Sequence, residues 1–192
     1  TAENVATKFQ VTREDQDKFA LRSQEKAVQA QKNNKFKDEI IDFKIKSKKT
    51  EIDFNKDEHP RDGINLEGLT RLKPVFQKDG TVTAGNASGI NDGAAAVTLM
   101  SDEEAKKRDL KKLVTIKSWA SCGVEPALMG TGPIPATKKA LDLAGWKVDD
   151  VDLFEVNEAF AAQSIAVLKT LGIPDEKVNV NGGAIAIGHP IG

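Results

Sequence analysis

The 192-residue sequence has one cysteine, two histidines, no excess of either charge and no long apolar run. The single cysteine, Cys122, excludes an internal disulfide and is typical of a reducing compartment. Because His59 and His189 stand far apart and no Cys or His cluster has ligand spacing, we expect no metal site. The 28 basic residues nearly cancel the 29 acidic ones, so net charge favours neither nucleic acid nor an anionic membrane.

The longest apolar stretches fall well short of a membrane span, and the first ten residues, TAENVATKFQ, lack the apolar centre of a signal peptide. Apolar residues make up 39% of the chain, which is enough to form a core. The length allows one large domain or two small ones. We therefore expect a soluble, cytoplasmic protein with neither nucleic acid nor membrane as a partner.

Several helices are indicated by their end signals. Thr12 followed by acidic residues predicts a helix start, and the helix should run to about Gln31. Its buried stripe would consist of Phe19, Ala20, Ala27 and Ala30. The residues Ser101–Glu104 form a capping-box pattern. A further helix should begin near Pro135 and stop at Gly145, and another should follow residue 157 and end at Gly172 and Pro174.

Strand patterns alternate with these helices. They cover residues 39–49, 113–124, 151–156 and 178–181, and residues 94–100 form a buried-type apolar run. This alternation predicts an α/β layer fold with a largely parallel sheet, preceded by a charged module that ends near residues 85–92. In the first strand Ile41, Phe43 and Ile45 share one face. Lys44, Lys46, Lys48 and Lys49 lie mostly on the other, which is either a plain solvated face or a site for an acidic group such as phosphate.

Ligands of open α/β sheets gather beyond the carboxyl ends of the strands. Three loops should lie there: residues 129–133, 157–161 and 182–192. A fourth, glycine-rich loop over residues 85–91 is either a surface connection or a close approach of backbone to a ligand. Each signal also has a plain structural explanation. Asn157 could simply cap the next helix, and His189, held extended by Pro190, could be an ordinary loop residue.

Taken together, Asn157 and His189 indicate a catalytic site. We expect their side chains to converge from neighbouring strand ends, where an amide and an imidazole can polarise a carbonyl or orient water. Imidazole also suits proton transfer near neutral pH. An acyl-transfer site would need a nucleophile as well. The only thiol is Cys122, which we interpret as a small buried or loop residue because nothing around it indicates activation.

The motifs NEAFA at residues 157–161 and NVNGGAIAIGHPIG at the end of the sequence resemble the thiolase family, in particular its biosynthetic acetyl-CoA acetyltransferase type. The likeness extends over the whole chain, through GTVTAGNASGINDGAAAV and MGTGPIPA, in the family's order. It implies an α/β fold with part of a thiolase-like layered helix–sheet core and an inserted loop domain. Residues 1–90 would be that loop domain, which binds coenzyme A. Residues 91–112 would close the first core half, and 113–192 would form a truncated second half.

The resemblance also implies roles for single residues. His189 corresponds to the histidine that deprotonates the nucleophilic thiol and helps to hold an oxyanion, and Asn157 to the asparagine that fixes a water in the same site. The residues implied along coenzyme A are Arg61, Phe76, Ala84, Ser88, Met129 and Phe160. From composition alone the two phenylalanines and the methionine could equally be core. Gly68 stands where some relatives have a serine near the adenine, which puts that contact in doubt.

The implied activity is condensation of two acetyl-CoA molecules to acetoacetyl-CoA and coenzyme A, or the reverse thiolysis, through a cysteine acyl-enzyme. Both catalytic cysteines of the family fall outside this sequence, so we expect a fragment that is inactive by itself. No cofactor is implied, since coenzyme A enters as substrate or product, and the full-length protein would be a homotetramer. Two alternatives are a non-catalytic module that binds coenzyme A or a protein partner, and an enzyme split over two chains.

Overall fold

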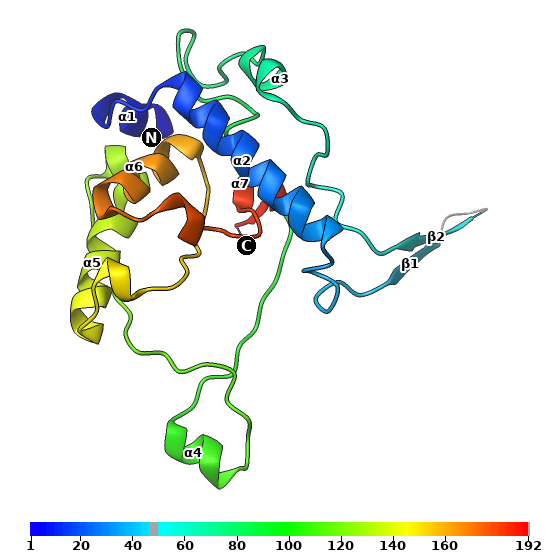
Figure 1. The fold of residues 1–192 in the computed structure, drawn as a ribbon, viewed down its shortest axis with the longest axis vertical. Coiled ribbons are helices and arrows are strands. Elements are labelled where there is room, and N and C mark those ends of the chain that lie inside the picture. Colours follow the sequence, from blue (N-terminus) through cyan, green and yellow to red (C-terminus); the bar gives the residue numbers. More distant parts are fainter. Residues whose placement is uncertain (47–49, 192) are drawn as a thin grey trace.

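The computed structural model describes residues 1–46 and 50–191. Its longest element, α2 (Arg13–Lys32), runs through the middle of the molecule and contacts α3 (Leu66–Thr70), α6 (Ala161–Leu171) and α7 (Ala184–Ile187) (Figure 1). The helix α1 (Ala2–Lys8) packs on α6, as does the 3₁₀ helix η1 (Pro126–Thr131). Two short 3₁₀ turns, Val148–Asp150 and Asp175–Lys177, flank α6 in sequence.

The start of α2 follows from a local hydrogen-bond exchange. The Thr12 hydroxyl accepts from the backbone N–H of Asp15 at 3.1 Å, and the Asp15 carboxylate accepts from that of Thr12 at 3.1 Å. These bonds from Thr12 lower the pKa of Asp15. The predicted helix is confirmed, and so is its buried stripe, since Phe19, Ala20, Ala27 and Ala30 are all buried.

The other predicted helix ends are confirmed as well, except that the helix expected to follow residue 157 begins only at Ala161. The helix α4 (Asp102–Lys107) begins after Ser101, whose hydroxyl accepts from the N–H of Glu104. The helix α5 (Pro133–Ala144) stops at Gly145, with φ at 71°, and α6 stops at Gly172, with φ at 67°. A left-handed residue at this point closes the last helical turn, and glycine adopts it without steric cost.

The core lies between α2 and α6. It contains Phe19 and Ala20 from α2, Leu69 from α3, Ile185 from α7 and most of α6. Its members from the α6 region are Ala161, Ile165, Val167, Leu168, Leu171, Ile173 and Val178. The helix α6 is buried around most of its circumference, because other elements cover it from several sides.

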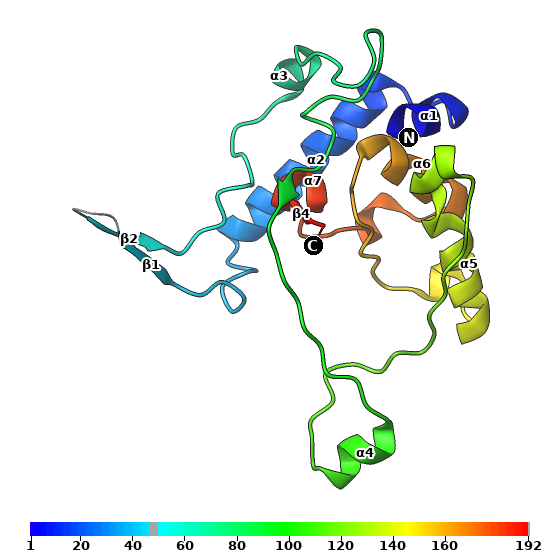
Figure 2. The same ribbon diagram turned by 180° about the vertical axis from the view of Figure 1, so that it is seen from behind.

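Most of the predicted sheet does not form among the described residues. Residues 94–100, 113–124 and 178–181 contain no strand, and 151–156 contributes one parallel bridge, Phe154 to Val178. The segments on either side of α4 are extended and exposed, with Val97 at 83% and Leu113 at 91% (Figures 1 and 2). The expectation of paired, buried strands there was wrong for this structure, because no described strand lies alongside to complete a hydrogen-bonded ladder.

Two short pairings are present. The strands β1 (Phe43–Lys46) and β2 (Glu51–Phe54) form an antiparallel hairpin that projects from the helices, with Phe43 opposite Phe54. Its Lys44 pairs with Glu51 and Asp53 on an exposed face, which favours the plain solvated interpretation of that face. Lys48 and Lys49 lie outside the described residues. The strands β3 (Ile90–Asn91) and β4 (His189–Pro190) pair in parallel, with Ile90 opposite His189.

Candidate functional site

Asn157 and His189, which the sequence places 32 positions apart, lie side by side. The Asn157 side-chain nitrogen Nδ2 is 3.3 Å from Nε2 of the His189 ring. Asn157 is exposed and His189 is half-buried, so the pair stands at the surface and can be reached by a ligand. The expected convergence of the two side chains is thus confirmed, while their catalytic role stays a prediction.

The polarity of this contact has a chemical consequence. The Asn157 amide nitrogen can only donate, so the pair forms a hydrogen bond when Nε2 is unprotonated. When Nε2 carries a proton, both nitrogens become donors. At a separation of 3.3 Å they can then share a single oxygen acceptor about 3 Å from each. The geometry therefore suits a basic imidazole that turns into half of an oxyanion-binding pair after it accepts a proton.

Asn157 does not cap α6. The N-cap residue is Phe160, and its backbone N–H donates to Oε1 of Gln163 at 3.4 Å. Nε2 of Gln163 reaches back to the carbonyl of Asn157 at 3.5 Å. The cap explanation for Asn157 was therefore wrong. Gln163 makes the side-chain hydrogen bond to the N-cap residue of α6, and the Asn157 side chain points to His189.

His189 is held through its backbone. Its N–H donates to the carbonyl of Gly89 at 3.1 Å and to Oδ1 of Asn91 at 3.2 Å, which fastens β4 to β3. The preceding Gly188 has φ at 92°, and a Cβ there would lie 2.4 Å from Asn91 Oδ1. Asn91, which the sequence marked only as a member of a polar loop, is thus part of the support of His189.

The loop over residues 85–91 joins the two site loops. Its Asn86 carbonyl accepts from Ala161 N–H at 2.9 Å, and the N–H and hydroxyl of Ser88 both donate to the Ala159 carbonyl at 3.1 Å. Its other end forms β3, beside His189. Because the Ser88 hydroxyl donates to the protein, its lone pairs remain available to a ligand N–H group.

Two aromatic side chains meet beside the 157–161 loop. Phe76 contacts Phe160 edge-to-face, with ring centroids 6.1 Å apart. Phe76 is 64% exposed and Met129 is 63% exposed, so the core explanation is wrong for both. Ala84 and Arg61 are exposed too, and no contact described for Arg61's side chain joins it to the other candidates. The structure thus brings Phe76 and Phe160 together and leaves Arg61 unlinked.

Buried polar groups under the site escaped the sequence analysis. Glu158, which is only 2% exposed, accepts hydrogen bonds from α2 and from the loop before β4. Burial and the neighbouring Glu158 carboxylate raise the pKa of Glu155. Burial lowers the pKa of Lys26, whose Nζ donates to the Val178 carbonyl at 2.6 Å. The buried position of Glu158 and its distant partners are not visible in the sequence pattern.

Other candidate features lie elsewhere or are not present among the described residues. Cys122 is a free, half-buried thiol in the extended segment before η1. Within the described ranges no group of three or more metal-ligating side chains could hold a metal ion. Over the same residues, no helix combines the length and apolar character needed to cross a membrane.

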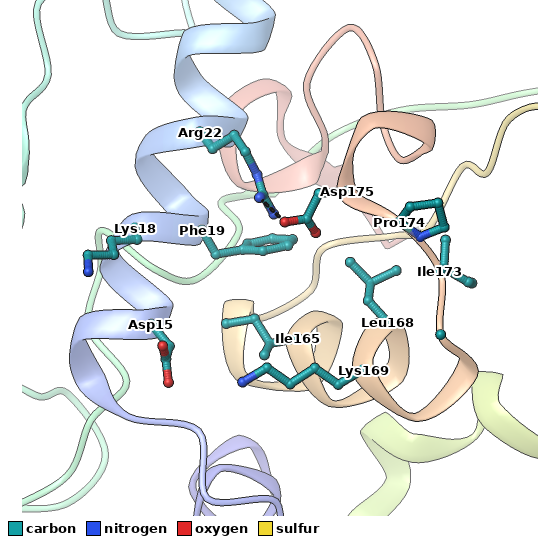
Figure 3. Close-up of a pocket in the computed structure, with 11 residues that line it drawn as sticks. Asp15, Lys18, Phe19, Arg22, Ile165, Leu168, Lys169, Ile173, Pro174 and Asp175 are labelled. Carbon is teal, nitrogen blue, oxygen red and sulfur yellow. Dashed lines mark hydrogen bonds and ion pairs between the residues drawn. The ribbon is translucent and has the colours of Figure 1, made fainter.

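A pocket of about 460 Å³ between α2 and α6 contains neither Asn157 nor His189 (Figure 3). Phe19, Ile165 and Leu168 form its apolar wall, and charged side chains including Lys18 and Lys169 surround it. Arg22 lies over the Phe19 ring and pairs with Asp175 at its edge. The candidate catalytic pair, Asn157 and His189, therefore lies outside this pocket.

Comparisons with known proteins agree with the resemblance in the sequence. Residues 1–103 match the family model described as thiolase, N-terminal domain, and residues 110–192 match thiolase, C-terminal domain. An acetyl-CoA acetyltransferase of Rhizobium meliloti (strain 1021) is 59% identical over 192 residues, which is 100% of this chain and 49% of the relative. The cytosolic acetyl-CoA acetyltransferase of Mus musculus is 57% identical over 194 residues, again 100% of this chain and 49% of the relative.

Two solved structures show the same fold. The Bacillus anthracis acetyl-CoA acetyltransferase superposes with a TM-score of 0.92 at 50% identity, covering 99% of this chain and 48% of that one. A human mitochondrial 3-ketoacyl-CoA thiolase in complex with CoA gives 0.90 at 48% identity, covering 100% and 47%. The expected fold class is confirmed. The chain spans about half the length of the curated relatives it matches. The division at residues 90 and 112 stays a prediction.

Proposed function

The chain belongs to the thiolase family, and from this we propose that it supplies the acid–base and oxyanion-binding part of an acetyl-CoA acetyltransferase site. The proposed reaction is the condensation of two acetyl-CoA molecules to acetoacetyl-CoA and coenzyme A, or the reverse thiolysis. It would proceed through a cysteine acyl-enzyme. No cofactor is proposed, because coenzyme A is itself substrate or product.

One observation carries this proposal: the contact of 3.3 Å between Asn157 Nδ2 and His189 Nε2. In the resting site His189 would accept from Asn157 and would thus present a basic nitrogen. A cysteine thiol brought to Nε2 would lose its proton to the ring, and the resulting thiolate would attack the thioester carbonyl carbon. A new C–S bond would form, and the thiolate of coenzyme A would leave when the old C–S bond breaks.

The same pair would then serve the carbon–carbon bond-forming step. A second cysteine thiolate, outside these residues like the nucleophile, would take a proton from the α-carbon of an acetyl-CoA molecule. The resulting carbanion would attack the acyl carbonyl, and the carbonyl electron pair would move onto oxygen. The Asn157 amide and the protonated His189 ring supply two donors to that oxygen. Collapse of the oxyanion would expel the cysteine thiolate. Donors aimed at developing charge in this way are each worth about 3–4 kcal/mol of transition-state stabilisation.

The rim of the site suits a long thioester substrate. The exposed Phe76 and Met129, with Phe160 and Ala84, provide apolar surface for the pantetheine arm, and Ser88 provides an acceptor for its amide. We assign Arg61 to the nucleotide end because it is exposed and no ion pair of its guanidinium is described within residues 1–46 and 50–191. That a related thiolase was solved with CoA supports this class of ligand.

The nucleophile would come from outside these residues. The only thiol, Cys122, lies in the extended segment before η1 and makes no described contact with His189 or Asn157. We therefore propose that the 192-residue polypeptide alone turns over no substrate and that a cysteine on another segment or chain completes the site. The second candidate function is binding of coenzyme A without catalysis. It rests on the same observation, that no thiol lies beside His189 among the described residues.

A thiolysis assay distinguishes the two functions. In the natural polypeptide that contains these 192 residues, acetoacetyl-CoA and coenzyme A should be converted to acetyl-CoA. Replacing Asn157 or His189 by Ala should lower kcat at least about a hundredfold, while calorimetry should show coenzyme A binding unchanged. Unchanged turnover in both variants would refute the catalytic role. Binding of coenzyme A without any turnover in the parent protein would favour the binding module.

A further inference from the structure

We propose that Glu158 is a positioning residue that sets the distance between Asn157 and His189. This inference rests on the proposed function, because it concerns how that pair is held. Glu158 directly follows Asn157 and is 2% exposed, so its carboxylate points into the protein while the Asn157 side chain points outward to His189. A buried carboxylate is costly unless its oxygens are hydrogen-bonded, and here they are.

Three donors from distant segments converge on this carboxylate. The Ser23 hydroxyl of α2 donates at 2.6 Å, Nδ2 of Asn179 at 2.9 Å and the backbone N–H of Ile185 in α7 at 3.2 Å. A carboxylate is the one common side chain that offers only acceptors, so it satisfies all three without competition. Hydrogen bonds to a charged acceptor are also stronger than neutral ones.

The loop that leads to His189 is fastened at this point. The N–H of Gly183 donates to the Ser23 hydroxyl at 3.0 Å, and that hydroxyl in turn donates to Glu158. A Cβ at residue 183 would lie 2.1 Å from the Glu158 carboxyl carbon. The backbone of the 182–188 loop therefore lies directly against the residue that follows Asn157.

Asn179 holds the other side of Asn157. Its Oδ1 accepts from the N–H of Val156 at 2.8 Å, and its Nδ2 donates to the Val156 carbonyl at 2.7 Å as well as to Glu158. The side chain thus acts as a neighbouring strand would, at the point where the segment becomes a loop. Asn157 is fixed because the residues before and after it bind the same carboxamide.

These contacts make Glu158 the junction between two loops. On one side it fixes Asn157. On the other it binds Ile185 of α7 and, through Ser23, the α7 N-cap residue Gly183, and both of these residues closely precede His189. No group of Glu158 reaches the reacting atoms, so its effect is through position. A displacement of about 1 Å can cost a hundredfold in rate, and it would be enough to break the 3.3 Å contact.

The test uses the natural polypeptide that contains this chain. Glu158→Gln keeps the size of the side chain but turns an NH₂ group toward donors. We expect kcat for thiolysis to fall about a hundredfold while KM for coenzyme A stays within about twofold, because Phe76 and Ser88 do not contact Glu158. A crystal structure should show the Asn157–His189 pair separated beyond hydrogen-bond distance. The matched control, Glu155→Gln, changes a carboxylate in the same segment for which no hydrogen bond is described, and it should leave kcat unchanged.

Should Glu158→Gln fail to fold, Ser23→Ala decides the question, since it removes one donor and the link to Gly183. A loss of about tenfold in kcat with KM unchanged supports the inference, and unchanged kcat refutes it. Unchanged kcat in a folded Glu158→Gln protein refutes it directly. If Asn157→Ala and His189→Ala leave turnover intact, the proposed function itself fails. If those two abolish turnover and Glu158→Gln does not, only the positioning role fails.

Discussion

Oδ1 of Asn91 accepts a hydrogen bond from the backbone N–H of His189 at 3.2 Å, across the parallel pair β3–β4. The same N–H also donates to the Gly89 carbonyl at 3.1 Å. This single donor, shared between two acceptors, fixes the backbone of His189 against the 85–91 loop, which itself bonds to Ala159 after Asn157. Support for the imidazole therefore comes from a segment about a hundred positions earlier in the chain, and it acts through the backbone N–H of His189.

Gly188→Ala should disturb this support. Residue 188 has φ at 92°, and the added Cβ would meet Asn91 Oδ1 at 2.4 Å. We expect the free energy of unfolding to fall by more than about 1 kcal/mol, measured by denaturant titration, and kcat to fall with it. Gly123→Ala is the control, because nothing lies within 4 Å of its added Cβ. It should change stability by less than about 0.5 kcal/mol. Equal effects in the two variants would contradict the steric argument.

Phe76→Ala should weaken coenzyme A binding without harming the fold. The ring is 64% exposed and contacts Phe160 on the rim of the site, so its removal deletes ligand surface more than core. We expect the Kd for coenzyme A to rise about tenfold, by calorimetry, with the melting temperature nearly unchanged. Phe43→Ala removes an equally exposed ring, 61% exposed, from β1 and should leave Kd unchanged. A Kd unaffected by Phe76→Ala would remove this residue from the ligand site.

Cys122→Ala should leave turnover of the natural polypeptide within about twofold of the parent, because a half-buried thiol outside the Asn157–His189 pair is not the proposed nucleophile. The measurement is the same thiolysis assay, with His189→Ala as the positive control for loss. Trapping of an acetyl group on a cysteine other than Cys122, seen by mass spectrometry of quenched enzyme, would agree with this. Loss of turnover in Cys122→Ala would show that the thiol is needed.

Asp102 should titrate far below an ordinary aspartate. Hydrogen bonds from Lys106 and then Lys112 lower the pKa of Asp102 from 3.8 to about 2. Because the pKa of Asp102 is lower in the folded protein, its ion pairs stabilise α4 fully above pH 3.8. This stabilisation is lost as the pH falls through about 2. Carboxyl NMR should show that midpoint, and Lys112→Ala should raise it. Lys107→Ala, an equal charge change without a described contact to Asp102, should move the midpoint much less, and added salt should shrink the difference.

Helix ends were predictable from sequence because their signals are local. Thr12 and Ser101 satisfy backbone N–H groups three residues away, and Gly145 and Gly172 close the turns that precede them. Whether residues 94–100 and 113–124 form strands was not predictable in the same way. An alternating apolar pattern indicates only that a segment is able to form a β-strand. Whether it pairs depends on a neighbouring strand elsewhere in the chain, and no described strand lies beside these two.

By itself the sequence determined the family, through NEAFA and the glycine-rich GHP segment. It also identified Asn157 and His189 as the candidate catalytic residues. Only the tertiary structure decided that the Asn157 side chain turns to His189 while Gln163 serves the helix end. Only the structure could show that Glu158 is buried, because its partner Ser23 is 135 positions away. Capping depends on atoms a few bonds apart, whereas a buried carboxylate is stable only where folding gathers its donors.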